Sequence, residues 1–302
     1  QSMNDLKTFY PVSDKAKART HIDAVTYDAM YQQSIDEPDI FWGEQALKFI
    51  DWTKPFDSVS SINFKESKVN WFAGGQLNVS YNCIDRHLAT KANDTAIIWE
   101  GDDPSEDAKI TYQELHDHVC RLANLLKARG VKKGDRVCIY MPMIPEVGYA
   151  MLACARIGAI HSVVFGGFSA EAIKSRVIDA DCQVIITADE SLRGGKKIPL
   201  KANVDAAIVD CDNVHTVVVV ERTGGDVHYN DKVDIRYTAA VAAMPAVCQP
   251  EVMDAEDPLF ILYTSGSTGT PKGVVHTCGG YILYAAMTHK YVFDYQEGDI
   301  YW

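Results

Sequence analysis

The chain has 302 residues, of which 47% are hydrophobic and 23% are charged. These values are typical of a soluble globular protein with one large domain or two average ones. The formal net charge of −12 argues against broad nucleic-acid binding, which needs a basic face. Because no apolar run approaches the roughly 20 residues that a membrane span needs, we expect a cytoplasmic protein with no membrane partner.

The first residues and the cysteines bear on the fold and on the compartment, respectively. Residues 1–3 (QSM) look like a protease-site scar before a start methionine, so we exclude them from the fold prediction. None of the eight cysteines forms a C-x-x-C pair, which argues against a zinc or dithiol site. Several stand inside apolar runs, where a reduced cysteine packs as a small core residue, and this usage indicates a reducing compartment.

Residues 4–90 form an opening segment with scattered aromatic side chains and little regular alternation. Helices are expected over 26–34 and 38–50. Many aromatics with few strand signals indicate a segment packed on a larger domain, which would occupy residues 91–302.

From about residue 95, short apolar runs alternate with amphipathic stretches. Strands are expected at 96–99, 137–140, 162–165, 184–187, 216–220 and 259–263. Helices are expected from a capping box at Thr111 and Glu114 to a stop at Gly130, then over 145–157, from Ser169, over 200–209 and over 280–290. Residues 239–251 are the best candidate for a connecting segment. This order predicts an α/β fold with a parallel sheet covered on both faces and ligands at the carboxyl ends of its strands.

The strongest chemical signal follows the strand expected at 259–263. Gly266, Gly269 and Gly273 permit positive φ and close backbone approach, and their N–H groups can form an anion-binding nest. The hydroxyl groups and the cation that would add to this nest are those of Thr264, Ser265, Ser267, Thr268 and Lys272. A merely flexible loop is the plain alternative. A kinase-type P-loop is the other, but Pro271 and Gly273 stand where that motif needs Gly and Ser or Thr.

The segment 263–273 (YTSGSTGTPKG) resembles the phosphate loop of the adenylate-forming superfamily, which includes acyl-CoA synthetases, peptide-synthetase adenylation domains and luciferases. In that family the loop holds the β- and γ-phosphates of ATP while a carboxylate attacks the α-phosphate. Other segments are similar to acetyl-CoA synthetases, namely 27–34, 41–42, 82–87, 98–103, 140–143, 153–159, 161–168, 275–281 and 291–295. Propionyl-CoA synthetases share the middle segments. The resemblance covers residues 22–302 and implies a large domain of layered sheets with flanking helices.

A second basic element follows the strand expected at 184–187. Arg193 and Lys196 straddle Gly194 and Gly195, so two cations at a tight turn could grip an anion. A solvated basic loop is the alternative from the residues alone. The resemblance implies a CoA site, in which Lys196 stands where a second arginine is common; a lysine keeps the charge but loses the bidentate fork.

A glycine turn adds to this expected CoA site. In the segment 166–168, Gly167 matches the turn that lines the pantetheine tunnel in the family. A tight turn after a strand is its structural alternative, and the two readings are compatible.

Other candidate metal-binding or catalytic residues have weaker support in the sequence. The acidic stretch 100–103 is more typical of a solvated turn than of a metal cluster. Histidines 87, 116, 118 and 161 have no partner at metal-ligand spacing, so surface or core roles are the default. No Gly-x-Ser-x-Gly element supports a hydrolase. We therefore predict no metal ligand and no catalytic side chain among these residues.

The resemblance implies acetyl-CoA synthesis in two steps, with acetate, ATP, CoA and magnesium. It also implies that the adenine contacts, the carboxylate pocket, the magnesium-binding acid, the hinge and a C-terminal domain with a catalytic lysine lie beyond Trp302. We expect the 302 residues to be a partial chain that does not turn over alone. The alternatives are a propionyl- or other short-chain acyl-CoA synthetase, a non-catalytic nucleotide- or CoA-binding module, and a peptide-synthetase adenylation domain.

Overall fold

The computed structural model describes residues 10–267 and 269–302. The chain separates into two compact units, one of residues 1–50 and 281–302 and the other of residues 51–280. The scar predicted at residues 1–3 lies outside the described part. The division of the chain near residue 90 stays a prediction.

The first unit is helical. Its helices are α1 (Asp14–Arg19), α2 (Ala24–Asp36), α3 (Pro38–Phe49) and the π-helix η4 (Thr288–Val292). The helices expected over 26–34 and 38–50 are confirmed. The Tyr291 hydroxyl ties η4 to α3, because it accepts a hydrogen bond from Lys48 Nζ at 2.7 Å and donates one to Gln45 Oε1 at 3.2 Å. Helix α11 (Cys278–Met287) confirms most of the helix expected over 280–290.

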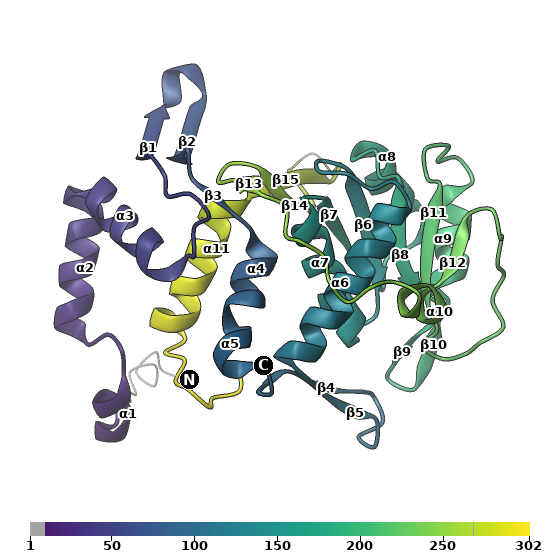
Figure 1. The fold of residues 1–302 in the computed structure, drawn as a ribbon, viewed down its shortest axis with the longest axis horizontal. Coiled ribbons are helices and arrows are strands. Elements are labelled where there is room, and N and C mark those ends of the chain that lie inside the picture. Colours follow the sequence, from purple (N-terminus) through teal and green to yellow (C-terminus); the bar gives the residue numbers. More distant parts are fainter. Residues whose placement is uncertain (1–9, 268) are drawn as a thin grey trace, which may run out of the picture. The chain divides into compact units, whose positions relative to one another are not determined.

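A seven-stranded sheet organises the second unit (Figure 1). In spatial order its strands are β12 (Asp234–Arg236), β11 (Thr216–Val220), β8 (Val184–Ala188), β6 (Arg136–Met141), β7 (Ile160–Phe165), β14 (Pro258–Thr264) and β15 (Lys272–Thr277). The first six are parallel, and β15 runs antiparallel to β14. Strands β8 and β11 are buried along their whole length, as continuous apolar runs in a parallel sheet require.

Helices cover both faces of this sheet. They are α6 (Tyr112–Ala128), α7 (Pro145–Ile157), α8 (Ala170–Asp179), α9 (Leu200–Ile208) and α10 (Tyr237–Ala242). Helix α6 packs on α7 at the front of the sheet in Figure 1, and α8 packs on α9 behind it. This follows from right-handed crossovers, because α7 connects β6 to β7 in one direction and α8 returns across β6 to β8.

Local capping explains two helix starts. The capping box predicted for α6 is confirmed, since Glu114 N–H donates to Thr111 Oγ1 at 3.1 Å and Thr111 N–H donates to Glu114 Oε2 at 2.8 Å. Ser169 caps α8 through the N–H of Ala172 at 3.3 Å. Each cap satisfies a helix N–H that has no partner within the helix.

Several elements differ from the sequence prediction. The strand expected at 96–99 belongs to a separate antiparallel pair, and other short pairs were not predicted. These pairs are β1 (Ser58–Asn63) with β2 (Lys68–Ala73), β3 (Gln76–Leu77) with β13 (Met253–Asp254), β4 (Thr95–Glu100) with β5 (Asp107–Thr111), and β9 (Ser191–Arg193) with β10 (Lys196–Ile198). Most are partly or fully exposed, so no continuous apolar run marks them. The connecting segment predicted at 239–251 begins inside α10.

The remaining short helices of the second unit lie between β1 and β4. They are η2 (Phe64–Glu66), α4 (Val79–Cys83), η3 (Asp85–His87) and α5 (Leu88–Lys91). Within the described residues, every helix is too short or too polar to cross a membrane.

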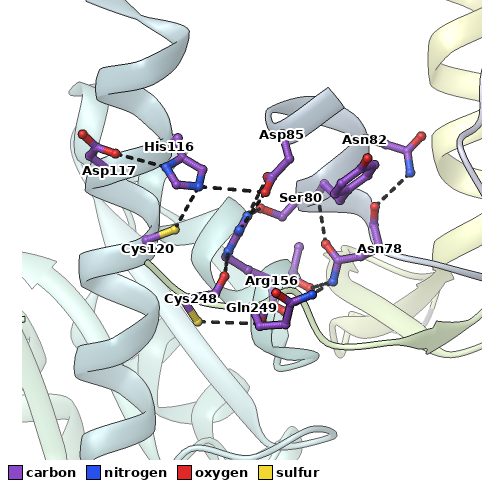
Figure 2. Close-up of polar contacts among 12 residues, drawn as sticks. Asn78, Ser80, Asn82, Asp85, His116, Asp117, Cys120, Arg156, Cys248 and Gln249 are labelled. Carbon is purple, nitrogen blue, oxygen red and sulfur yellow. Dashed lines mark hydrogen bonds and ion pairs between the residues drawn. The ribbon is translucent and has the colours of Figure 1, made fainter. Parts of the chain in front are cut away.

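A buried ion pair joins two of the segments that the resemblance singled out (Figure 2). Arg156 of α7 is 2% exposed, and its two terminal nitrogens each donate to an Asp85 carboxylate oxygen at 2.8 Å. Its Nε donates to the Cys248 carbonyl at 2.6 Å. Burial lowers the pKa of Arg156, but Asp85 more than offsets this and the net pKa is raised. Asp85 and Arg156 thus hold the segments 82–87 and 153–159 together.

The cysteines behave as core residues. All eight are free thiols, and seven of them are buried. Burial raises the pKa of Cys154 to about 12, so that thiol stays protonated at neutral pH and is a poor nucleophile.

Candidate functional site

The predicted binding residues lie where parallel strands end. Strand order reverses at β6, which has β7 on one side and β8 on the other. Ligands of open α/β sheets bind at the carboxyl ends of the strands near such a reversal. The segments after β7, β8 and β14 carry the residues predicted for CoA and ATP.

The predicted phosphate loop connects β14 to β15 as a hairpin. Thr264 pairs with Lys272 in the ladder, so the loop residues project beyond the end of the sheet. Gly266 has φ +61° and Gly269 has φ +79°, which confirms positive φ at both. A Cβ on Gly266 would lie 3.1 Å from the Thr270 carbonyl oxygen, so a side chain there would crowd the loop as well as strain it.

The other loop residues are exposed. Ser265 and Ser267 lie in the loop with their side chains in solvent, where their hydroxyls are accessible to an anion. Thr268, also predicted for this site, lies outside the described residues. Gly273 does not have positive φ, but the close backbone approach that the sequence also indicated for it is observed. Its Cβ would lie 2.9 Å from Ile261 Cγ2, so its glycine instead permits the close approach of β15 to β14.

The predicted CoA element is the β9–β10 hairpin. Arg193 and Lys196 face each other across its last rung, and both are exposed. Gly194 at φ +56° and Gly195 at φ +73° form the two-residue turn between them. Two consecutive positive-φ residues are what a type I′ hairpin turn requires, and its twist matches that of the strands.

The predicted glycine turn follows β7 and is held from below. Tyr140 of β6 donates to the Phe168 carbonyl at 2.8 Å and accepts from Asn203 Nδ2 at 3.2 Å. Burial raises the pKa of Tyr140, which keeps its hydroxyl protonated as a donor. A Cβ on Gly167 would lie 2.6 Å from Cε1 of Phe165, so only glycine leaves this ring its observed position.

A row of rings and guanidinium groups connects these three elements. Arg193 lies over the Phe165 ring at 5.3 Å, and Phe165 packs edge-on against Phe168 at 5.6 Å. Arg176 of α8 lies over Phe168 at 5.0 Å and over Tyr263 at 5.4 Å. We call these five residues the edge row. Because Tyr263 directly precedes Thr264, the row runs from the β9–β10 turn to the start of the β14–β15 loop.

The end of the row nearest the loop is fixed by a carboxylate. The Tyr263 hydroxyl donates to Asp179 Oδ2 at 2.6 Å. Burial raises the pKa of Tyr263, and the acceptor Asp179 raises it further. Sequence reasoning did not single out Phe165, Arg176 or Tyr263 individually. Phe165 and Tyr263 stand inside the segments quoted for the resemblance, whereas nothing in the sequence distinguished Arg176 from an ordinary helix-surface cation.

A buried carboxylate supports the start of the β9–β10 hairpin. Asp189, which follows β8 directly and is 1% exposed, accepts hydrogen bonds from the N–H groups of Glu190 at 2.6 Å, Arg222 at 2.9 Å and Gly224 at 2.8 Å. Such a nest of N–H groups stabilises an anion. It fastens the segment after β11 to the segment after β8.

The histidines hold structural positions. His161 lies in β7, stacks on Phe260 at 5.4 Å, and has its pKa lowered by burial to about 4. His116 lies 3.0 Å from Asp117 through Nδ1, and Cys120 Sγ lies 3.5 Å from its Nε2 (Figure 2). His118 stacks on Tyr149 at 4.6 Å, and His87 packs against Tyr112 at 5.4 Å.

Two cavities lie away from the predicted residues. One of about 440 Å³ in the first unit is lined by residues that include Lys48 and Tyr291. One of about 310 Å³ in the second unit is lined by residues that include Trp52 and Asn78.

Comparisons with known proteins agree along the chain. The sequence profile described as AMP-binding enzyme matches residues 84–302, and the profile described as acetyl-coenzyme A synthetase N-terminus matches residues 27–83. The chain belongs to the AMP-binding enzyme family.

Curated relatives with high sequence identity to the chain are acetyl-coenzyme A synthetases. The chain is 64% identical to an acetyl-coenzyme A synthetase of Saccharophagus degradans over 97% of this chain and 45% of that protein. It is 62% identical to acetyl-coenzyme A synthetase 2 of Pseudomonas aeruginosa over the same shares. The chain thus spans less than half the length of the relatives that it matches, at their N-terminal part.

A solved structure shares the fold. The acetoacetyl-CoA synthetase from Streptomyces lividans superposes with a TM-score of 0.82 at 26% identity, over 94% of this chain and 43% of that chain. The predicted α/β class is confirmed, and the two edge strands of the sheet, β12 and the antiparallel β15, are its unpredicted features.

Proposed function

We propose that the chain forms the N-terminal portion of an acetate–CoA ligase that produces AMP. In the first step ATP and acetate give acetyl-adenylate and pyrophosphate; in the second, the CoA thiol displaces AMP and gives acetyl-CoA. The observation that carries the proposal is the edge row, because it joins a phosphate-type loop to a basic hairpin at one end of one sheet. High identity to acetyl-coenzyme A synthetases supports the choice of acetate.

In the first step the β14–β15 loop holds the β- and γ-phosphates of ATP. The positive-φ glycines at 266 and 269 leave the backbone N–H groups open to the phosphate oxygens. The hydroxyls of Thr264, Ser265, Ser267 and Thr268 are proposed as further donors, and Lys272 as the point charge at the base of the loop. The loop therefore contributes to catalysis by positioning ATP and by stabilising the charge of the leaving pyrophosphate. No side chain of the loop transfers a proton.

In the second step the β9–β10 hairpin and the glycine turn hold CoA. Arg193 and Lys196 present two cations at a turn with backbone on both sides, and Gly194 and Gly195 keep the surface between them free of side chains. The exposed Phe165 ring packs directly against Gly167, and we propose that this turn and ring line the path of the pantetheine arm. Because Lys196 is a point charge, its contact with a phosphate lacks the bidentate geometry of an arginine.

Magnesium accompanies ATP in this proposal but enters no step that these residues perform. In the part of the chain that the structure describes, no three His, Cys, Asp or Glu side chains gather as a metal site would need. We assign the magnesium-binding acid, the acetate pocket and the catalytic lysine to sequence beyond Trp302. Lys272 is therefore a phosphate-binding residue and not the catalytic lysine. Without those later groups, the 302 residues alone do not turn over.

The cytoplasm is the compartment that we propose. Eight free thiols are typical of a reducing environment, and the proposed partners are small molecules: acetate, ATP and CoA. The net charge of −12 supports the absence of nucleic-acid binding.

Exchange of labelled pyrophosphate into ATP tests the proposal on the protein at the full length of its relatives. We expect exchange that depends on acetate and is weaker with propionate. Stronger exchange with propionate would change the substrate and keep the adenylation. Exchange with neither acid would overturn the proposed function. The 302-residue chain serves as the control and is expected to release no AMP from acetate and ATP.

A further inference from the structure

An acidic loop contacts the turn of the basic hairpin. The Gly195 N–H donates to Asp102 Oδ2 at 3.2 Å, across 93 positions of sequence. Asp102 belongs to the acidic stretch 100–103, for which the sequence offered only a solvated turn or a metal cluster. The hydrogen bond gives this carboxylate a partner at the centre of the proposed CoA site.

The loop that carries Asp102 is braced internally. Gly101 N–H donates to the Glu106 carbonyl at 2.7 Å and closes the β4–β5 hairpin. Asp103 accepts from the N–H of Ser105 at 2.9 Å and from its hydroxyl at 2.8 Å. Asp103 therefore stabilises its own turn, and it is Asp102 that reaches the neighbouring hairpin.

The same loop is also anchored to the body of the second unit. Trp99 Nε1 donates to the Met143 carbonyl at 2.8 Å, in the segment after β6. Arg222, after β11, forms an ion pair with Glu106 and lies over the Trp99 ring at 5.4 Å. Asp102 is thus presented from a support that is fixed at two places on the carboxyl edge of the sheet.

The hairpin that receives the hydrogen bond needs such an anchor. Its ladder has three residue pairs, and a short two-stranded hairpin is marginally stable by itself. Gly194 and Gly195 lose more conformational freedom on ordering than any other residue type would. Without a fixed partner, the turn that sets the spacing of Arg193 and Lys196 would sample many conformations.

We propose that Asp102 is a positioning residue for CoA binding. It fixes the Gly194–Gly195 turn through the Gly195 N–H and so pre-orders Arg193 and Lys196 for the phosphates of CoA. This inference rests on the proposed function of the hairpin. Asp102 acts through the turn and does not itself contact CoA. Pre-ordering raises affinity by removing an ordering cost from the binding step.

The test compares Asp102→Ala with Asp102→Asn and with the control Asp107→Ala in the full-length protein. Asp107 is an exposed aspartate on β5 of the same hairpin, so its variant matches the charge change. We expect Asp102→Ala to raise the KM for CoA roughly tenfold, which is the order of one hydrogen bond to a charged group. The amide oxygen of Asn still accepts, so Asp102→Asn retains most of the affinity. Acetate-dependent pyrophosphate exchange stays unchanged in all three variants.

A second readout does not depend on turnover. Hydrogen exchange of a peptide spanning 191–198 is expected to accelerate in Asp102→Ala but not in Asp107→Ala. If Asp102→Ala changes neither the KM for CoA nor the hydrogen exchange of residues 191–198, the inference is overturned. So would a lower KM for CoA, which would mean that the carboxylate competes with a CoA phosphate. If the unsubstituted protein adenylates acetate but forms no thioester, the CoA role of the hairpin fails first and the inference fails with it.

Discussion

At the scale of single residues, His161 shows how burial changes the charge of a side chain. It lies in β7 between β6 and β14, and burial lowers its pKa from 6.5 to about 4. The folded state therefore favours the neutral imidazole. The stability that neutral His161 allows is fully present above pH 6.5 and is lost as the pH falls towards 4. In that range the unfolded chain binds a proton at this histidine and the folded chain does not, so the free energy of unfolding falls.

We predict that the free energy of unfolding falls by about 2–3 kcal/mol between pH 7 and pH 4.5 because of this one group. His161→Gln removes the titration, so its pH dependence should be smaller by that amount although its stability at pH 7 is lower. Urea unfolding at the two pH values measures both. Equal losses in the variant and the unsubstituted protein would show that His161 is not buried as described.

The glycines of the site differ in what they do. Gly194, Gly195, Gly266 and Gly269 adopt positive φ, which the sequence predicted for the phosphate loop from residue type and spacing. Gly273 lacks positive φ and makes room for Ile261, which is the close approach that the sequence also indicated. Residue type alone does not separate conformational freedom from lack of volume, so this distinction required the coordinates.

At the scale of elements, buried apolar runs were predictable and exposed pairs were not. Strand β11 occupies residues 216–220 as expected, and α7 occupies 145–157. Strand β15 was missed because its first four residues are exposed and it directly follows a loop rich in glycine and hydroxyl residues. The loop after β14 is therefore a hairpin turn, whereas the sequence indicated a strand, a loop and then a helix.

A buried ion pair between Asp85 and Arg156 joins η3 to α7, and its removal should lower the free energy of unfolding. The Asp85 side chain is 16% exposed. Arg156→Met leaves its carboxylate without the guanidinium partner. We predict a loss of about 3–5 kcal/mol in the free energy of unfolding, because a buried charge loses its partner. Urea denaturation measures it.

A matched control and a second variant sharpen that prediction. Lys68→Met breaks an exposed pair with Glu66 and should cost about 0–1 kcal/mol. Adding Asp85→Asn to Arg156→Met should recover part of the loss, because the uncompensated charge is gone. A loss for Arg156→Met no larger than that for Lys68→Met would contradict a structural role for the pair.

At the scale of the whole molecule, the sites proposed for the two half-reactions lie at one edge of one sheet. The sequence predicted the two binding elements separately, from the loop motif and from the family resemblance. Their connection depends on which strands are neighbours, and the order β8-β6-β7-β14 follows from no local pattern. The edge row could be recognised only after that order was known.

The most direct test separates the two half-reactions in the full-length protein with Lys272→Ala and Arg193→Ala. Acetate-dependent pyrophosphate exchange should fall roughly ten- to hundredfold in Lys272→Ala, which is the order of a lost charge-assisted contact, and should be unchanged in Arg193→Ala. The KM for CoA in thioester formation should rise by a similar factor in Arg193→Ala. If Arg193→Ala instead lowers pyrophosphate exchange as much as Lys272→Ala does, the two elements do not divide the reaction and the account is wrong.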